Sequence, residues 1–189
     1  MEERINKRET GPEATAALLR DYFHIPGQDI RSYSPLTLAF LGDNVFDLIV
    51  RTILVERGNR QVNSLHREKS RIVKAAAQAQ ILDAIKEHLS PEEESVTRRG
   101  RNAKSYSVPK NAKLSDYRKA TGLEALYGYL YLKGDTERIL ELTGIGLAAL
   151  GVTETVAETA AQQTEDGRAD APLDQENDGQ QTDQQQEEG

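Results

Sequence analysis

Two isolated acidic residues, Asp43 and Glu124, are the strongest candidates for chemistry in this chain of 189 residues. Asp43 follows Gly42 and borders an apolar row, where burying a carboxylate is unfavourable without a hydrogen-bond partner or a metal. The glycine itself weakens a helix by roughly 1 kcal/mol relative to alanine. Glu124 stands in a second apolar, glycine-containing run, Thr121–Gly128. The sequence therefore predicts that the two carboxylates share a divalent cation, and hard carboxylate oxygens suit Mg²⁺, with Mn²⁺ as a substitute.

A cationic segment, Thr97–Lys119, leads directly into the run that contains Glu124. Its only acidic residue is Asp116. Such a run on its own is most often a solvated face, but here it would place cations beside the expected metal site, as a phosphate-backbone substrate requires. The residues predicted to bind RNA are Arg98, Arg99, Arg101, Lys104, Lys110 and Lys113.

Two polar residues lie one helical turn from the acids and have two interpretations each. Asp47 lies four residues after Asp43, where it could hold a metal-bound water, although a surface ion pair with Arg51 is favoured. Thr121 lies three residues before Glu124, where its hydroxyl could hydrogen-bond a metal-bound water, although an ordinary helix residue is an equally good interpretation.

The pattern predicts an all-α domain of six or seven helices, because no strand-like alternation is present. The helix that contains Asp43 should begin after the Ser34-Pro35 pair and end near Arg57. Its apolar side is predicted to be Leu38, Leu41, Val45, Leu48 and Ile49. The other helices are expected over residues 13–23, two pieces within 61–89, 90–100, 115–132 and 135–150.

Charge divides the chain into a basic body and an acidic tail. Residues 151–189 hold 11 acidic residues and one basic residue, a net charge of −10, so the whole-chain charge of −7 leaves +3 for residues 1–150. The tail has no aromatic residue and is predicted to be disordered. The expected organisation is an N-terminal extension with a short helix over 1–27, a catalytic domain over 28–150 and the tail over 151–189. The absence of cysteine and of a long apolar run fits a cytoplasmic protein that does not enter the membrane.

The stretch from Leu38 to Asp43 with Val45 resembles the signature helix of the ribonuclease III family, and Glu124–Gly128 resembles its second acidic helix. Residues 34–150 as a whole resemble the short bacterial form, Mini-ribonuclease III, which lacks a separate double-stranded-RNA-binding domain. Full-length enzymes have further acidic residues at the positions of Leu36, Ala39 and Thr121. The resemblance therefore assigns the catalytic and metal-binding roles to Asp43 and Glu124 alone.

The resemblance implies a metal-dependent endoribonuclease that cuts double-stranded RNA to leave 5′-phosphates. It also implies a homodimer that matures the precursor of large-subunit (23S) ribosomal RNA, with ribosomal proteins as further partners. A small domain should not bury Phe40, Phe46, Tyr127 and Tyr131 alone, which also favours a dimer. The alternatives are a non-catalytic RNA- or ribosome-binding protein on the same fold, and a helical adaptor whose basic loop binds an acidic protein.

Overall fold

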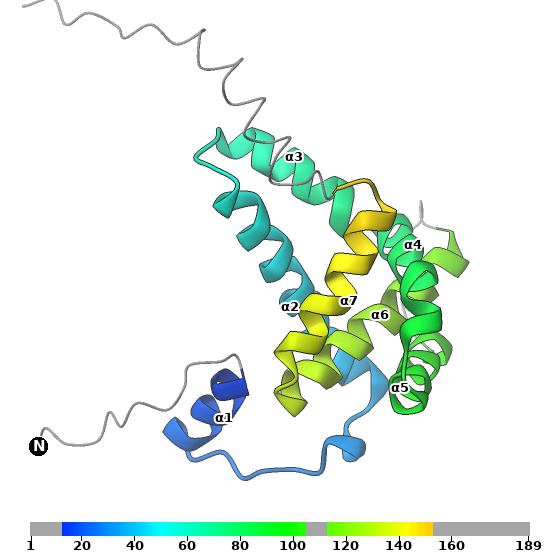
Figure 1. Cartoon of the computed structure of the whole chain (residues 1–189). Helices are drawn as coiled ribbons and strands as arrows, with labels where there is room; N and C mark the ends of the chain where they lie inside the picture. Colours follow the sequence, from blue (N-terminus) through cyan, green and yellow to red (C-terminus); the bar gives the residue numbers. More distant parts are fainter. Residues whose placement is uncertain (1–12, 105–112, 153–189) are drawn as a thin grey trace, which may run out of the picture. The chain divides into compact units, whose positions relative to one another are not determined.

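The computed structural model describes residues 13–104 and 113–152, and every regular element among them is helical (Figure 1). The α-helices are α1 (Glu13–Tyr22), α2 (Pro35–Glu56), α3 (Val62–Val73), α4 (Ala75–Ile85), α5 (Pro91–Asn102), α6 (Leu114–Lys133) and α7 (Thr136–Ala149). Two short 3₁₀ turns are η1 (Ile30–Ser32) and η2 (Lys86–His88). The predicted all-α fold is confirmed, and so is the division of residues 61–89 into two helices.

Local sequence signals account for several helix ends. The Ser34 hydroxyl accepts a hydrogen bond of 3.0 Å from the backbone N–H of Thr37, and Pro35 follows at the first helical position. Ser90 and Glu93 form a reciprocal capping box at the start of α5. Gly134 ends α6 with a φ of 82°, a left-handed conformation that favours glycine. Asp135 stands at the predicted start of α7, but its side chain makes no capping hydrogen bond.

Helix α6 is the centre of the fold, because α2, α4, α5 and α7 all pack against it (Figure 1). Tyr127 is fully buried in α6 and its ring meets Phe46 of α2 edge-on, with the ring centroids 5.4 Å apart. The Tyr127 hydroxyl is 2.7 Å from the Thr143 hydroxyl of α7, so its polar end is also satisfied. A single chain thus buries Phe46 and Tyr127, whereas Phe40 is 78% exposed and Tyr131 is only partly buried, so the four aromatic residues are not all buried by one chain, as predicted.

Glycines let α6 approach its two main neighbours at backbone distance. A Cβ atom built on Gly42 of α2 would lie 1.8 Å from the carbonyl oxygen of Glu124, and one built on Gly128 would lie 2.0 Å from the carbonyl oxygen of Leu38. On the α5 side, a Cβ on Gly122 would lie 2.9 Å from the Thr97 carbonyl oxygen. These glycines serve helix packing within one chain.

The buried face of α2 differs from the predicted one. It follows a four-residue row that contains Gly42, and Leu48 from the predicted row is 65% exposed. The reason is the size of the side chains. The backbones of α2 and α6 meet at Gly42, so the row of α2 that faces α6 must contain this glycine. The buried residues of α2 are Leu38, Ala39, Gly42, Phe46, Val50 and Leu54.

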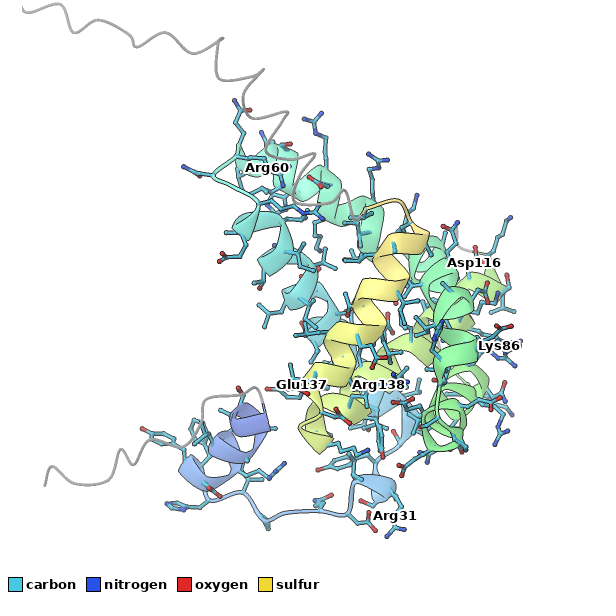
Figure 2. All side chains as sticks on the ribbon, viewed as in Figure 1. Arg31, Arg60, Lys86, Asp116, Glu137 and Arg138 are labelled. Atoms are coloured by element: carbon cyan, nitrogen blue, oxygen red, sulfur yellow. The ribbon has the colours of Figure 1, made fainter. Side chains whose placement is uncertain are left out.

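An ion pair fastens α5 to α7. Arg138, labelled on α7 in Figure 2, donates to both carboxylate oxygens of Glu93 at 2.9 and 3.0 Å. Glu93 is 6% exposed and also accepts the capping bond from the Ser90 backbone N–H. Burial would raise the pKa of Glu93, but the hydrogen bonds from Arg138 and Ser90 lower it below its usual value.

The C-terminal limit of the packed body lies slightly beyond the predicted one. Val152 packs against the core, and its carbonyl accepts a hydrogen bond of 2.8 Å from Arg57. Val152 is thus part of the packed body, and the predicted tail from residue 153 onward lies outside the described residues. Within the described ranges, no helix has the length and apolar character needed to cross a membrane.

We predict that Gly42→Ala lowers the free energy of unfolding by about 3 kcal/mol, because its methyl group would meet backbone atoms that can move only if α2 and α6 separate. Urea unfolding followed by circular dichroism measures this. Gly144→Ala in α7 is the matched control, since nothing lies within 4 Å of its added methyl group and it should stabilise the helix by up to ~1 kcal/mol. Equal stability of the Gly42→Ala variant and the parent would contradict the crossing described above.

Candidate active site and adjacent basic surface

The crossing of α2 and α6 brings the two predicted acids together. Gly42 packs against the backbone of Glu124, and Asp43 is the next residue of α2. The two carboxyl groups are close enough for the charge of Asp43 to raise the pKa of Glu124. Residues 81 positions apart in sequence therefore form one acidic pair, as the sequence predicts.

Burial is divided unequally between the two acids. Asp43 is exposed, so the cost expected for burying its carboxylate does not arise. Glu124 is only partly exposed and carries that cost instead. Burial first, and then the Asp43 charge, raise the pKa of Glu124 to about 7, against a hydrogen bond from Gln78 that lowers it.

The residues of this pair fit a hydrated divalent cation. Two neighbouring carboxylates whose mutual repulsion raises a pKa are a charge arrangement that a cation would relieve. Within residues 13–104 and 113–152, no group of three or more His, Cys, Asp or Glu side chains could enclose a metal. The donor set is thus two carboxylates, which suits an ion such as Mg²⁺ that keeps several of its waters.

Asp47 forms the ion pair that the sequence favours. Arg51 donates to one carboxylate oxygen, and Lys69 of α3 lies 2.6 Å from the other. Burial would raise the pKa of Asp47, but the hydrogen bonds from Lys69 and Arg51 lower it. Asp47 therefore links α2 to α3, and its role beside a metal-bound water stays a prediction.

Thr121 is buried on α6, and its hydroxyl donates to the Tyr117 carbonyl at 3.1 Å. Its backbone carbonyl lies against Gly100 of α5, where an added Cβ would come within 2.9 Å. These contacts give Thr121 a packing role, and its assignment to the outer coordination shell is untested.

The predicted RNA-binding residues lie on and around the end of α5. Arg98, Arg99 and Arg101 are exposed on its last turns, and Lys104 is exposed just after the helix. Lys113 is exposed immediately before α6. Lys110 lies outside the described residues. Arg98 and Arg99 thus lie in the helix predicted over residues 90–100, and Arg101, expected just beyond it, is also helical because α5 continues to Asn102.

A surface cavity of about 350 Å³ lies between α4, α5 and α6 beside these cations. Arg98 and Arg101 line it together with two cations outside the predicted set, Lys86 and Lys119. Lys119 is held by Asp83 of α4, with its Nζ at 2.8 and 2.6 Å from the two carboxylate oxygens. Lys86 lies on η2 and is labelled in Figure 2. Its place beside the arginines of α5 could not be predicted from the sequence, because it depends on the turn that follows α4.

One further polar residue near the acids was missed. Gln78 of α4 is 2% exposed, donates from Nε2 to the Val73 carbonyl at 3.0 Å, and lies near enough to Glu124 to lower its pKa. The available signal was a lone glutamine on the apolar side of an alanine-rich helix, but that pattern does not say which residue the amide meets.

Comparison with known proteins places this site in a family. A model of the ribonuclease III domain matches residues 36–135, which contain both acids and all of the predicted RNA-binding residues. A Mini-ribonuclease 3 of Thermoanaerobacter sp. is 50% identical over 119 residues, covering 61% of this chain and 84% of the relative. The Mini-ribonuclease 3 of Enterococcus faecalis is 41% identical over 128 residues, covering 67% and 97%.

A crystal structure of a Fusobacterium nucleatum protein supports the same fold. It shares 31% sequence identity with a TM-score of 0.59, over 67% of this chain and all of that one. The chain belongs to the ribonuclease III family, in its Mini-ribonuclease 3 branch. It is therefore an endoribonuclease, and the enzymatic interpretation is confirmed over a non-catalytic RNA-binding protein or an adaptor.

We predict that ionisation of Glu124 destabilises the metal-free fold as the pH rises. Its pKa is about 7 in the folded chain and near the ordinary 4.5 in the unfolded chain, so between these values the folded state binds more protons and stability falls with pH. Glu124→Gln removes this loss. From pH 4.5 to pH 8 the variant should gain on the parent by about 2 kcal/mol, less than the full shift implies because the group is partly exposed.

Urea unfolding in the presence of a chelator measures the two pH profiles. Glu137→Gln, at an exposed glutamate of α7, is the control and should follow the parent. Parallel profiles for the Glu124→Gln variant and the parent would show that Glu124 titrates normally.

Proposed function

We propose that the chain hydrolyses double-stranded RNA with a divalent cation held by Asp43 and Glu124. The observation that carries this proposal is the acidic pair at the crossing of α2 and α6, because two coupled carboxylates beside a cationic surface match the needs of phosphodiester hydrolysis. The cation is proposed to be Mg²⁺, with Mn²⁺ as a substitute. The products are 5′-phosphates and 3′-hydroxyls, as the family resemblance implies.

The two acids have different roles because their surroundings differ. Glu124 is fixed by packing around α6 and presents its carboxylate from a partly buried position, whereas Asp43 lies exposed on the side open to a substrate. When bound, a divalent cation supplies a nucleophilic water and neutralises charge on the scissile phosphate. The chain's own residues orient that phosphate between the carboxylates and the cations of α5.

The basic surface supplies affinity without reading the RNA sequence. Arg98, Arg99 and Arg101 stand on a helix packed against α6, so their distance from Glu124 is fixed by the fold. Phosphate contacts of this kind give salt-dependent binding. Selection of RNA over DNA would rest on the A-form shape and the 2′-hydroxyl groups of the duplex.

The physiological substrate is proposed to be a duplex stem at the ends of the precursor of 23S ribosomal RNA, in the cytoplasm and with ribosomal proteins as helpers. The names of the Mini-ribonuclease 3 relatives support only ribonuclease activity. Mapping the ends of 23S RNA in cells depleted of the protein tests the proposal. Unchanged ends would point to a different duplex.

A homodimer is proposed because α2 exposes an apolar row on the same helix as Asp43. Phe40 is 78% exposed, Leu48 65% and Val55 57%, and this spacing places them along one side of the helix. Exposed apolar patches of this kind commonly mark a protein interface. A twofold partner packed here would bring a second acidic pair to the same duplex, so that both strands are cut in one encounter.

We predict that Asp43→Asn and Glu124→Gln each lower the cleavage rate by more than about 100-fold, while binding of the duplex persists. Loss of a residue that only supports a metal ligand typically costs about 10–100-fold, so loss of a ligand should cost more. Both changes keep the size of the side chain and remove the charge that would hold a cation. Cleavage of a labelled RNA duplex with Mg²⁺ measures the rate, and the DNA duplex of the same sequence is the negative substrate.

Removal of basic residues should weaken binding of the RNA duplex, which the acid variants are expected to retain. Arg98→Ala with Arg101→Ala should weaken binding and reduce the slope of log K against log salt by about 0.9 for each phosphate that the protein no longer neutralises. The matched control removes two exposed arginines of α3, Arg67 and Arg71. If the Asp43→Asn and Glu124→Gln variants cut at the parental rate, the assignment of the active site is wrong. If the α5 and α3 double variants have equal salt slopes, the RNA binds to a different surface.

We predict that the parent sediments at twice its chain mass of 21.0 kDa and that Phe40→Glu reduces it to the monomer. The substitution places a charge in the proposed interface, and the side chain is too exposed to support the fold of one chain. Leu140→Glu on α7 changes another exposed leucine and should leave the dimer intact. A dimer that survives Phe40→Glu would mean that a different surface pairs.

A further inference from the structure

The cavity of about 350 Å³ between α4, α5 and α6 has a surplus of positive charge. The charged residues that line it are Lys86, Arg98, Arg101, Lys119, Asp83 and Glu94. Four cations against two acids leave a formal net charge of +2. The volume lies within the range of small-molecule pockets, roughly 300–1,000 Å³. The cavity therefore has the charge and the room for an organic anion.

Most of this positive charge is available to a ligand. Among the described residues, no ion pair joins Lys86, Arg98 or Arg101 to an acid. Lys119 is held by Asp83, with its Nζ at 2.8 and 2.6 Å from the two carboxylate oxygens, but an ammonium group has three N–H donors. One donor of Lys119 thus remains for an anion in the cavity.

Thr97 adds a buried hydroxyl to the wall of the cavity. It is 7% exposed, and its Oγ1 atom has no hydrogen-bond partner among the described residues. A threonine in a helix commonly bonds to a carbonyl three or four residues earlier, and this one does not. A buried hydroxyl without a partner costs free energy, so an oxygen of a ligand would supply what the fold leaves out.

The remaining wall is apolar and firmly held. Leu82 and Leu89 line the cavity and offer a surface for the organic part of a ligand. Helices α5 and α6 cannot shift easily, because a Cβ on Gly122 would lie 2.9 Å from the Thr97 carbonyl oxygen and one on Gly100 would lie 2.7 Å from the Ala125 Cβ. The cavity is thus formed before any ligand binds.

The cavity is separate from the acidic pair. Lys119 precedes Glu124 by five residues on α6, which in a helix is about 7.5 Å along the axis and a rotation of about 140°. Glu124 lies where α2 crosses α6, whereas Lys119 pairs with α4. An anion in the cavity is therefore not the phosphate that the acidic pair would cut.

We propose that this cavity is a binding site for a phosphomonoester, either a free nucleotide or the 5′-phosphate of an RNA end. A phosphomonoester carries about −1.5 to −2 charges near pH 7 and three terminal oxygens, which match the net charge and the converging donors. A backbone phosphate carries only one charge and must let the chain leave on both sides. This binding needs neither a metal ion nor cleavage, so it holds or fails independently of the hydrolysis proposed above.

Calorimetry of the full chain with a chelator present measures binding of guanosine 5′-monophosphate, with guanosine as the unphosphorylated counterpart. Lys86→Ala and Thr97→Val should each weaken binding of the nucleotide at least about tenfold, because each removes a donor to a charged group. Lys86 is exposed, so its variant keeps the fold. Lys74→Ala, at the other end of α4 and outside the cavity, should bind as the parent does.

Two further measurements separate ligand binding from helix packing. Glu94→Gln removes a negative charge from the lining and should bind the nucleotide more tightly than the parent. Thr97→Val removes an unsatisfied hydroxyl and should not lower the melting temperature while it weakens binding. If Lys86→Ala and Thr97→Val both bind the nucleotide as the parent does, the phosphate lies elsewhere and the inference is wrong.

A single-stranded RNA with a 5′-phosphate, compared with the same strand ending in a 5′-hydroxyl, separates the two sources of the phosphate. Binding of guanosine 5′-monophosphate identifies a free nucleotide as a ligand. A preference for the phosphorylated strand alone, lost in Lys86→Ala, identifies the RNA end. If neither phosphorylated probe binds better than its counterpart, the inference fails.

Glu124→Gln distinguishes this site from the proposed active site. It should bind the phosphorylated probe as the parent does while cleavage is lost. If the variant also loses the probe, the phosphate binds at the acidic pair and no separate site exists. If it keeps both the probe and cleavage, the proposed hydrolysis at Glu124 is wrong while the phosphate site stands.

Discussion

The contact between the backbones of α2 and α6 determines where the chemistry can occur. Gly42 and Gly128 leave no side chain between the helices, so the turn that ends in Asp43 rests directly on the turn that contains Glu124. Gly100 and Gly122 make a comparable contact between α5 and α6. The central helix therefore fixes the acids relative to each other, and it fixes the arginines of α5 relative to both.

Close packing also makes the two acids unequal. Glu124 lies on the helix that is surrounded by its neighbours, so burial and the charge of Asp43 raise its pKa to about 7. Asp43 lies on an outer helix and stays exposed. One carboxylate is thus held firmly by the fold and the other is accessible, an asymmetry that follows from the architecture rather than from the residue types.

The sequence predicted the helices, the acidic pair and the basic run because each depends on local signals or on a family pattern. Capping residues such as Ser34 and Ser90 mark helix ends without any tertiary contact. The sequence did not predict the buried face of α2, because periodicity records which residues are apolar and not which must be small. It also did not predict that Gln78 would be buried near Glu124, because that depends on which helix packs opposite it.

The placement of charge explains how an acidic pair and a basic surface coexist on one small domain. Within the described residues, neither Asp43 nor Glu124 forms an ion pair, whereas Asp47 takes Arg51 and Lys69, and Asp83 takes Lys119. The structural acids therefore engage nearby cations, whereas among the described residues no cation pairs with either candidate catalytic acid. If Arg98 or Arg101 reached Glu124, each would neutralise the group that a divalent cation needs. The acids lie on α2 and α6 and the arginines on α5, and the packing of all three helices together holds the two kinds of charge in separate places.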